Sequence, residues 1–369
     1  MSMFGGVGGV GPMGGVGGVG LMGGVGNLNY TGLGAFLGAG ADPVFDPMLV
    51  QGLQASAQAI SHVAIDPPGT PPPPANEMSF SSPGNLECWA DWVRASLYLS
   101  DFMQSLEWRI DKRARSIMIG FEGQEFYRLR RPSITTFQEQ LKIVRSYADQ
   151  RVDRTAEILT QLGFPTPYFM MILGLQTAPN RHTLELITVT QVLSAHVCMI
   201  AKHHLACRRP DRLGASVMPI IPTPAHGSFP SAHATEAFAV AEVLNSMIGN
   251  QKPAHYPDPG KRQRLISKLA ERIAVHRTVA GLHFPIDSWA GAILGRAVGQ
   301  LILARCGASG GVDAYRYDAR GNLDFFLAEF SKGANRPFGV HRTGSCEARR
   351  SDLFEWLWMK ASKEFDLAR

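Results

Sequence analysis

Three short clusters in the sequence combine basic, histidine and acidic residues at spacings that suit a site for a tetrahedral anion. The first is the run KHHLACRRP, which contains Lys202, Arg209 and Pro210. We expect Lys202 in the last turns of an apolar helix and Arg209 in the loop after it, because Pro210 cannot continue the helix. A lysine point charge and an arginine fork suit an oxyanion. Alternatively, both residues complement the negative end of the helix.

The second cluster is GSFPSAHATEAFAVAEVL, which begins at Gly227. A helix that starts with Ser231, Ala232 and His233 would present free N–H groups as an anion cradle. His233 would lie in the first turn, where the helix dipole disfavours its charged form, and this setting suits proton transfer. Ser231 as a simple N-cap is the alternative, but it leaves His233 unexplained.

The third cluster is HRTVAGLHFPIDSWAG, in which Arg277 lies six residues before His283 and Asp287 lies four after it. The Phe284–Pro285 pair predicts a break between two helices. Across this break the carboxylate of Asp287 can reach one imidazole nitrogen of His283 and fix its tautomer. A histidine buried in an ordinary helical core is the alternative.

Taken together, the clusters match the patterns KxxxxxxRP, PSGH and SRxxxxxHxxxD. The sequence thereby resembles the superfamily that unites type 2 phosphatidic acid phosphatases, bacterial class A acid phosphatases and vanadium-dependent haloperoxidases. The stretch from about Tyr127 to Gly299 is similar to the soluble bacterial branch of that superfamily. Two positions depart from the patterns: Ala232 replaces a glycine and His276 replaces a serine.

As a phosphatase, the resemblance implies metal-independent hydrolysis of a phosphomonoester, without a cofactor. His283 would form a phosphohistidine, Asp287 would support it, and His233 would exchange protons with the leaving group and water. The implied phosphate-binding residues are Lys202, Arg209, Ser231, Ala232 and Arg277.

As a haloperoxidase, the resemblance implies vanadate bound through His283, with hydrogen peroxide and halide as substrates. His226 lies seven residues before His233 and would be a halide or entrance residue. The short spacings between the clusters favour the phosphatase, but the residues alone do not separate the two enzymes. A binding or assembly protein with a vestigial site is a third interpretation.

The elements that must position these clusters are predicted to be helices. From Asn85 onward the apolar spacing is helical, and a single amphipathic helix is expected over 134–162, with one apolar stripe from Phe137 to Leu159. Further helices are expected over 85–110, 181–208, 232–248, 262–282, 286–305 and 350–366, and no strands. The prediction is an all-α helical bundle over 84–369, of the type that the resemblance implies.

Residues 1–83 are predicted to form a disordered tail. GGVGGVGPM is followed by GGVGGVGLM, a nine-residue repeat without the Asp that a calcium-binding β-roll would need, and PPGTPPPP over 67–74 predicts a stiff spacer. Self-association or docking of the tail is the alternative, with an unknown partner.

The amino-acid composition limits the kinds of partner and substrate that the chain is expected to bind. The chain has a net charge of +5, and residues 1–83 contain only acidic charges, so the remainder is strongly basic and favours small anionic substrates. A basic stripe interleaved with aromatic residues would predict nucleic-acid binding, and the sequence contains no such stripe. The apolar segment Leu184–Ala201 is interrupted by polar residues and no signal peptide is recognised, so we expect a cytoplasmic chain without membrane spans. The family precedent implies a homodimer.

Overall fold

The computed structural model describes residues 47–61, 78–251, 256–309 and 311–366. The α-helices are α2 (Pro47–Ser61), α3 (Asp91–Ser105), α4 (Ile134–Ser146), α5 (Arg151–Thr160), α6 (Thr166–Leu173), α7 (Arg181–Leu205), α8 (Ala232–Gly249), α9 (Pro259–Val279), α10 (Pro285–Arg305), α11 (Leu327–Phe330) and α12 (Asp352–Asp366). The strands are β1 (Leu106–Asp111), β2 (Ser116–Phe121), β3 (Gln124–Arg130), β4 (Val312–Tyr317) and β5 (Val340–Cys346). Short 3₁₀ helices are η3 (Pro83–Cys88), η4 (Ala148–Gln150), η5 (Pro210–Arg212), η6 (Ala215–Val217) and η7 (Arg336–Phe338).

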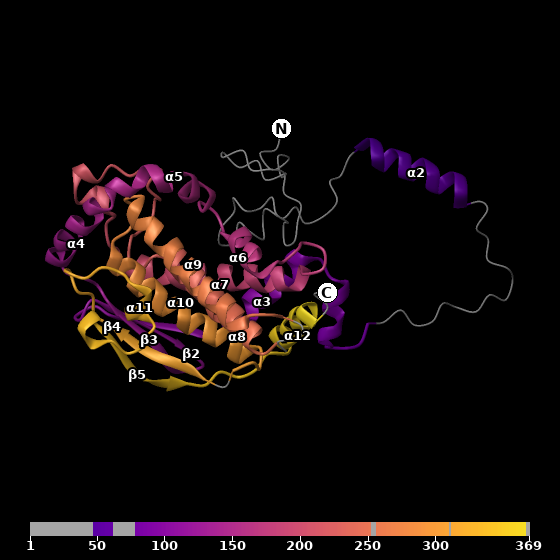
Figure 1. The fold of residues 1–369 in the computed structure, drawn as a ribbon. Helices are drawn as coiled ribbons and strands as arrows, with labels where there is room; N and C mark the ends of the chain where they lie inside the picture. The colour runs from indigo at the N-terminus through magenta and orange to yellow at the C-terminus, as the bar shows by residue number, and fades with distance from the viewer. Residues whose placement is uncertain (1–46, 62–77, 252–255, 310, 367–369) are drawn as a thin grey trace.

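The long helices α7, α8, α9 and α10 form the core that carries the three clusters (Figure 1). Helix α8 packs against α7, α9 and α10. All four were predicted from the sequence, and their observed bounds differ from the predicted ones by three residues or fewer. Their apolar residues face in several directions, as expected of helices buried inside a domain.

Glycines on α10 allow α8 to approach closely. A Cβ placed on Gly295 would lie 2.3 Å from the Thr235 carbonyl oxygen, and one on Gly291 would lie 2.4 Å from the Ser231 oxygen. Both distances are far below van der Waals contact, so only glycine permits this helix pair. The contact brings the start of α8 against the start of α10, where two of the clusters lie.

A five-stranded sheet lies against the helices, and the all-α prediction was therefore wrong. Its order is β1-β2-β3-β4-β5, antiparallel except for the parallel pair β3–β4. Helix α10 packs against β3 and β4, and α7 against β2. Figure 1 shows the sheet along one side of the helical layer. The predicted helix over 85–110 ends at Ser105 and gives way to β1.

The strands escape a search for period-two alternation because few of them alternate. Only Leu106 of β1 is buried, whereas β2 is apolar almost throughout. The register Tyr127↔Tyr315 joins β3 to β4 across nearly 190 residues of sequence. Such pairing depends on tertiary contacts, since strand preference reflects packing against neighbours more than intrinsic backbone preference.

The single helix predicted over 134–162 is two helices. Helix α4 ends at Ser146, and η4 turns the chain before α5 begins. The apolar stripe is buried up to Val144, but Val152 and Leu159 are exposed. The break is important for the site, because it directs the end of α5 toward α9.

The segment predicted as a disordered tail contains one described helix, α2, whose described side chains are exposed. The Gly-Val repeats and the Pro-rich spacer over 67–74 lie outside the described residues.

Helix α7 has the length and apolar character of a membrane span. Within the segment Arg181–Arg212 the most apolar window of 18 residues has a mean hydropathy of 1.6, and 78% of that window is buried inside the protein. The polar residues noted along Leu184–Ala201 therefore do not exclude this segment as a candidate span.

Candidate active site

His283 and Asp287 connect the end of α9 to the start of α10. His283 Nδ1 lies 2.8 Å from Asp287 Oδ2. The same carboxylate oxygen accepts the Phe284 N–H at 3.1 Å and the Ser228 hydroxyl. Phe284 is the N-cap of α10, so one carboxylate both caps the helix and holds the imidazole. This is the pairing predicted across the Phe284–Pro285 break.

The hydrogen bonds of His283 identify its tautomer. Its Nε2 lies 2.8 Å from Arg209 Nη1, and a guanidinium can only donate, so Nε2 accepts and Nδ1 carries the proton. Burial, and then the charges of Arg209 and Lys202, hold the pKa of His283 well below its usual range. Burial raises the pKa of Asp287 to about 6. At neutral pH a neutral imidazole therefore faces the cations with its Nε2 lone pair, which is the state of a nucleophile.

Lys202 and Arg209 both donate hydrogen bonds to the loop that precedes α8. Lys202 Nζ donates to the Gly227 and Ser228 carbonyls at 2.9 and 2.8 Å. Arg209 donates to the Leu282 carbonyl at 3.0 Å in addition to His283. Burial lowers the pKa of Lys202 to about 8. Both cations are thus held in place beside His283, as the sequence predicts.

The start of α8 supplies a narrower anion cradle than expected. Ser231 caps the helix through its side chain, and its own N–H donates to the Asp287 carbonyl at 2.9 Å. That donor is occupied. Among the described residues no hydrogen bond engages the backbone N–H groups of Ala232 and His233, which leaves these two donors for an anion.

Arg277 and His233 lie close to the two cations beside His283, where the end of α5 covers them. His233 Nε2 donates to the Gln161 carbonyl at 2.9 Å, and Arg277 contacts the Ile158 carbonyl and Gln161 Oε1, both at 3.4 Å. The Arg277 Nε is buried without a partner among the described residues. Since buried donors are normally bonded, this nitrogen is available to an anion.

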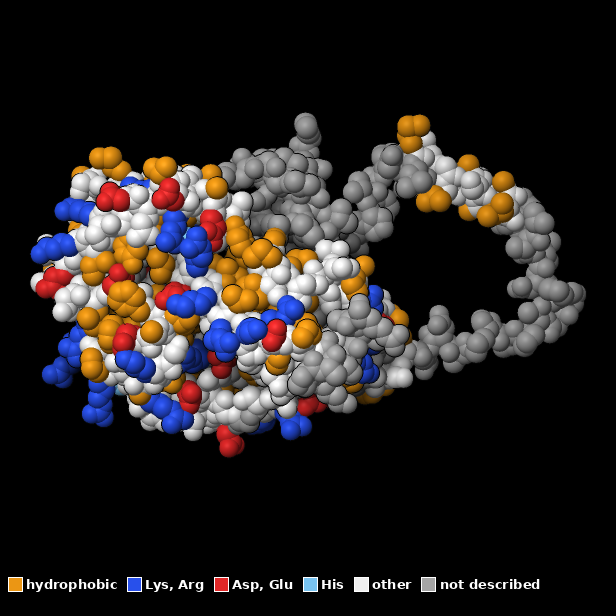
Figure 2. Space-filling model, viewed as in Figure 1, with side chains coloured by type: hydrophobic (Ala, Val, Ile, Leu, Met, Phe, Trp, Pro, Cys, Tyr) orange, Lys and Arg blue, Asp and Glu red, His pale blue; other side chains and the backbone are white. Residues whose placement is uncertain are grey.

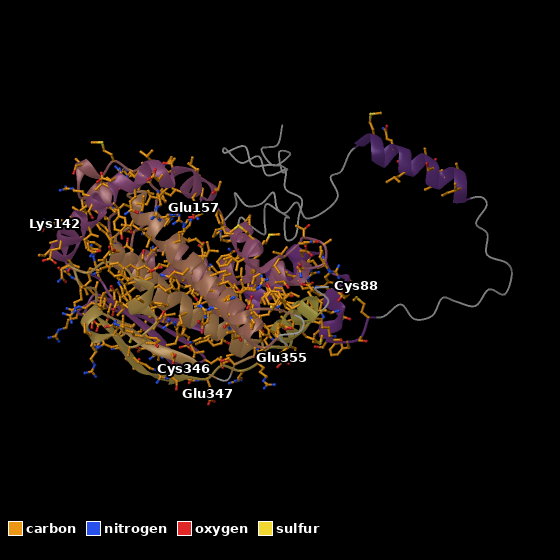
Figure 3. The ribbon with its side chains drawn as sticks, viewed as in Figure 1. Cys88, Lys142, Glu157, Cys346, Glu347 and Glu355 are labelled. Carbon is orange, nitrogen blue, oxygen red and sulfur yellow. The ribbon has the colours of Figure 1, made fainter. Side chains whose placement is uncertain are left out.

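His276, which replaces the serine of the family pattern, contributes to this cover. Its Nδ1 lies 2.9 Å from Gln161 Oε1, and its Nε2 lies 3.3 Å from Arg154. Arginine can only donate, so Nδ1 carries the proton and donates to Gln161. Glu157 of α5, labelled in Figure 3, pairs with Arg272 of α9 and fastens the two helices together beside this contact.

His226 lies at the exposed edge of the site. Its Nδ1 is 3.2 Å from Arg209 Nη2, and its carbonyl accepts from Arg209 Nε at 3.1 Å. The residue is therefore next to Arg209 and accessible to solvent, and its assignment as an entrance or halide residue stays a prediction.

Three functional candidates were missed by the sequence reasoning. Glu236 is buried one turn after His233, and burial raises its pKa to about 8 although Lys202 and Arg277 lower it. The spacing of three residues on a buried helix face was the available signal. Ser228 and Gln161 carried no such signal, because their roles depend on loops that meet only in the folded chain.

A helical domain with a carboxylate-backed histidine amid buried cations has the arrangement expected for binding a tetrahedral oxyanion. Comparison with known proteins agrees at the level of the superfamily. Residues 184–308 match the model of the PAP2 superfamily, and this segment contains every site residue predicted from the sequence. Assignment to the soluble bacterial branch stays a prediction.

Two curated relatives represent two chemistries. The chain is 28% identical to a decaprenylphosphoryl-5-phosphoribose phosphatase of Mycobacterium tuberculosis over 134 residues, which cover 36% of this chain and 67% of the relative. It is 33% identical to the vanadium-dependent bromoperoxidase of Ascophyllum nodosum over 94 residues, or 21% of this chain and 17% of the relative. The comparisons thus support a phosphatase-type hydrolase at superfamily level and leave the haloperoxidase open.

A solved structure is also similar, that of a transmembrane PAP2-type phosphatidylglycerolphosphate phosphatase from Bacillus subtilis. It has a TM-score of 0.35 and 17% identity, and the match covers 44% of this chain and 82% of that one.

The expectation of a cytoplasmic location is corrected by the apolar character of α7. It rested on the absence of a membrane-length apolar helix, and the segment containing α7 meets that criterion.

Proposed function

We propose that the chain is a metal-independent phosphatase that hydrolyses a phosphomonoester through a phosphohistidine on His283. The observation that carries the proposal is the hydrogen-bonded series Asp287–His283–Arg209, which holds a neutral imidazole with its Nε2 lone pair among cations. The match of residues 184–308 to the PAP2 superfamily supports it.

In the first step His283 Nε2 attacks phosphorus, the bond from phosphorus to the leaving oxygen breaks, and the Nδ1 proton stays on its bond to Asp287. Lys202, Arg209 and Arg277 stabilise the charge on the equatorial oxygens, together with the free N–H groups at the start of α8. In the second step His233, neutral after it has protonated the leaving oxygen, accepts a proton from the attacking water. The P–N bond then breaks, and inorganic phosphate is released.

His233 is the proposed proton donor to the leaving oxygen. Burial and the charge of Arg277 lower its pKa to about 3, so it is neutral before substrate binds. A bound phosphate opposes the charge of Arg277, and His233 therefore takes up a proton together with the substrate. The leaving oxygen takes the place of the Gln161 carbonyl, which the His233 Nε2 now contacts.

A vanadium-dependent haloperoxidase is the second candidate, favoured by the match to the Ascophyllum nodosum enzyme and by the contact between His226 and Arg209. The residues fit vanadate as they fit phosphate, because the unpartnered Arg277 Nε could donate to an oxyanion oxygen and the Nε2 lone pair of His283 could bond to the central atom. His283 would hold it, with Lys202 and Arg209 balancing its charge. Bound vanadate would supply the activation of peroxide for halide oxidation.

A paired assay on metal-stripped protein distinguishes the two enzymes. One arm follows hydrolysis of p-nitrophenyl phosphate, and the other follows peroxide-dependent bromination of a phenol dye after addition of orthovanadate. We expect hydrolysis that orthovanadate inhibits, and no bromination. Vanadate-dependent bromination would instead establish the haloperoxidase and make His226 a halide-site residue.

The variant His283→Ala tests the covalent step. Loss of the nucleophile is expected to lower turnover by about three orders of magnitude or more, and acid-labile phosphate should no longer attach to the protein after a rapid quench. The matched control is His182→Ala, which replaces a buried histidine bonded to Glu364 away from the site. Turnover retained by His283→Ala would exclude the phosphohistidine.

A further inference from the structure

A second hollow lies on the opposite side of the loop that carries Arg209. It has a volume of about 840 Å³ and is bounded by the turn between β1 and β2, the end of β3, the start of α4 and the end of α7. A neighbouring cavity of about 510 Å³ shares residues 115 and 131–133 with it. We call the two cavities together the basic groove.

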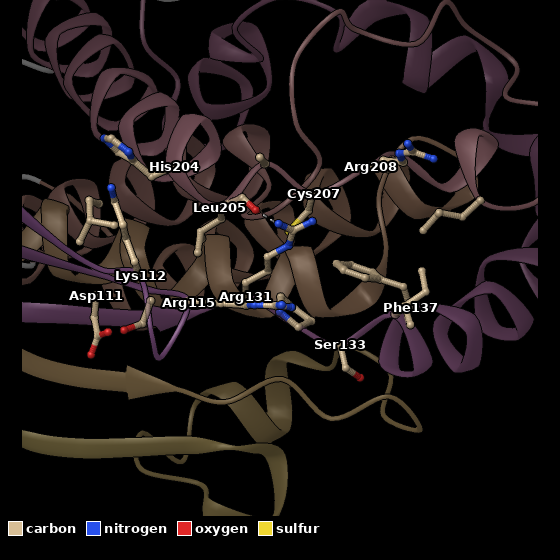
Figure 4. Close-up of a pocket in the computed structure, with 16 residues that line it drawn as sticks. Asp111, Lys112, Arg115, Arg131, Ser133, Phe137, His204, Leu205, Cys207 and Arg208 are labelled. Atoms are coloured by element: carbon tan, nitrogen blue, oxygen red, sulfur yellow. Dashed lines mark hydrogen bonds between the residues drawn. The ribbon is translucent and has the colours of Figure 1, made fainter.

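The basic groove is lined by seven cations and two carboxylates. The larger cavity contributes Lys112, Arg115, Arg131 and Arg208, and the smaller one adds Arg113, Arg130 and Arg320. Figure 4 shows Lys112, Arg115, Arg131 and Arg208 around one cavity, with Lys112 pointing toward the end of α7. Further Lys and Arg side chains, outside the groove, project from the edge of the molecule where α4 lies (Figure 2), and Figure 3 labels one of them as Lys142.

These cations are not neutralised by the protein. All seven are exposed, and within the part of the chain that the structure describes none forms an ion pair. The two acids of the groove have other partners. Asp111 accepts the Ala114 N–H at 2.8 Å, and Asp318 pairs with Arg316 at 3.1 Å. The concentrated positive charge is therefore available to a ligand, and it lowers stability unless one is bound.

The excess of charge indicates a ligand with several phosphates. A single phosphate carries about two charges near neutral pH, too few to balance the groove, and arginine forks match phosphate oxygens in particular. Proteins that bind single-stranded nucleic acid combine a basic groove with exposed aromatic rings on which the bases stack. Among the residues that line the basic groove Phe137 is buried, and His204 supplies the one exposed ring.

The basic groove is separate from the catalytic site. Arg208 is exposed to the groove, whereas the next residue, Arg209, is 3% exposed and contacts His283. The backbone immediately before Arg208 is held in place through the Cys207 carbonyl, which accepts the Ser228 N–H at 2.9 Å. The segment 207–209 therefore separates the basic groove from the catalytic site.

We propose that the basic groove binds a ligand with clustered phosphates, either a free polyphosphate or the head group of a polyphosphorylated lipid. Binding in the basic groove does not depend on the catalytic mechanism, because the groove is lined by residues that segment 207–209 separates from the catalytic site.

Calorimetric titration of the full chain with inorganic tripolyphosphate tests the proposal. The His283→Ala background prevents hydrolysis of the ligand. The triple variant Lys112→Gln/Arg115→Gln/Arg320→Gln is expected to bind at least about tenfold more weakly, with a shallower dependence on salt. Arg131 is left in place because its guanidinium contacts the Cys207 thiol.

Two controls assign the binding to the groove. The matched triple Lys261→Gln/Arg264→Gln/Arg349→Gln removes the same charges from exposed positions outside the groove and should change affinity less than about twofold. Arg209→Gln, which removes a cation of the catalytic site, should do the same. If affinity falls with Arg209→Gln and not with the groove triple, the ligand binds at the catalytic site and the proposal is wrong.

Vesicles identify the source of the phosphates. Phosphatidylcholine vesicles that contain phosphatidylinositol bisphosphate are compared with vesicles that carry equal charge as phosphatidylserine. Binding to the first kind alone, lost in the groove triple, supports a lipid head group. Binding of tripolyphosphate alone supports a free polyphosphate. Equal binding to both vesicles, or tighter binding of a short RNA that the groove triple abolishes, would overturn the proposal.

Discussion

Lys202 and Glu236 are two buried groups of the catalytic site that change charge in the same pH range. Burial lowers the pKa of Lys202 to about 8 and raises that of Glu236 to about 8. Below this range the lysine is charged and the carboxyl of Glu236 is neutral, so the site is more positively charged than it is above this range. Above it the lysine loses a positive charge and Glu236 gains a negative one. Both changes oppose the binding of an anion.

We therefore expect the affinity for tungstate, a stable dianion, to fall by at least about tenfold between about pH 7 and pH 9. Glu236→Gln keeps the neutral form at every pH and should make this fall smaller. Glu242→Gln on the same helix, whose carboxylate contacts Gln300, is the matched control and should not alter the fall. Calorimetry at a series of pH values measures the affinity of the parent protein and of both variants for tungstate. An unchanged profile in Glu236→Gln would remove Glu236 from the site.

At the scale of elements, the close contact between α8 and α10 positions the anion cradle against Asp287. The Ser231 N–H donates to the Asp287 carbonyl, so the first turns of the two helices are joined directly. That contact is possible only because glycines on α10 face the α8 backbone. The helix pair therefore places residues from two clusters side by side in one site.

Gly295→Ala should separate this pair. Its Cβ would meet the Thr235 carbonyl oxygen at 2.3 Å, so we expect a loss of roughly 1–3 kcal/mol in the free energy of unfolding and weaker anion binding. Gly260→Ala in α9 is the control, because its Cβ would meet only Arg264 at 3.8 Å. That change should stabilise the protein by about 0.5–1 kcal/mol. Urea denaturation compares them, and equal stability of the two variants would refute the close contact.

At the scale of the whole molecule, elements from both ends of the described domain are fastened to α7. Arg94 of α3 forms two hydrogen bonds of 2.7 Å with Glu185. Glu364 of α12 accepts the His182 and Thr183 N–H groups at 2.8 Å and so caps the start of α7. These anchors lie at the opposite end of α7 from Lys202, and they determine stability separately from chemistry.

Arg94→Met should therefore cost about 3–5 kcal/mol, because it leaves Glu185 buried without its counter-ion. Turnover of p-nitrophenyl phosphate at low temperature should stay within about twofold of the parent. The exposed pair Arg181–Glu87 provides the control, since Arg181→Gln should cost less than about 1 kcal/mol. Thermal unfolding measures the difference. In the double variant Arg94→Met/Glu185→Leu most of the lost stability should return, and no recovery would mean that packing, not charge, explains the loss.

The sequence by itself predicted the long helices and the candidate residues of the site. Arg209, His283 and Asp287 could be found because each lies within two residues of a proline at a helix end, and Lys202 because it is a cation near the end of an otherwise apolar helix. Local chemistry of this kind is encoded over a few residues. Helices α7 to α10 were predicted for the same reason, since their apolar spacing is local.

Only the tertiary structure decided the sheet, the cover over Arg277 and the basic groove. Strands β3 and β4 pair across a long stretch of chain, so their pairing cannot be found from neighbouring residues. Strand β1 has one buried residue, so it lacks an alternating apolar pattern. Gln161 reaches the site because α4 and α5 separate at η4, and the groove cations come from three distant segments. Contacts between distant segments are determined by packing, and no short stretch of sequence contains them.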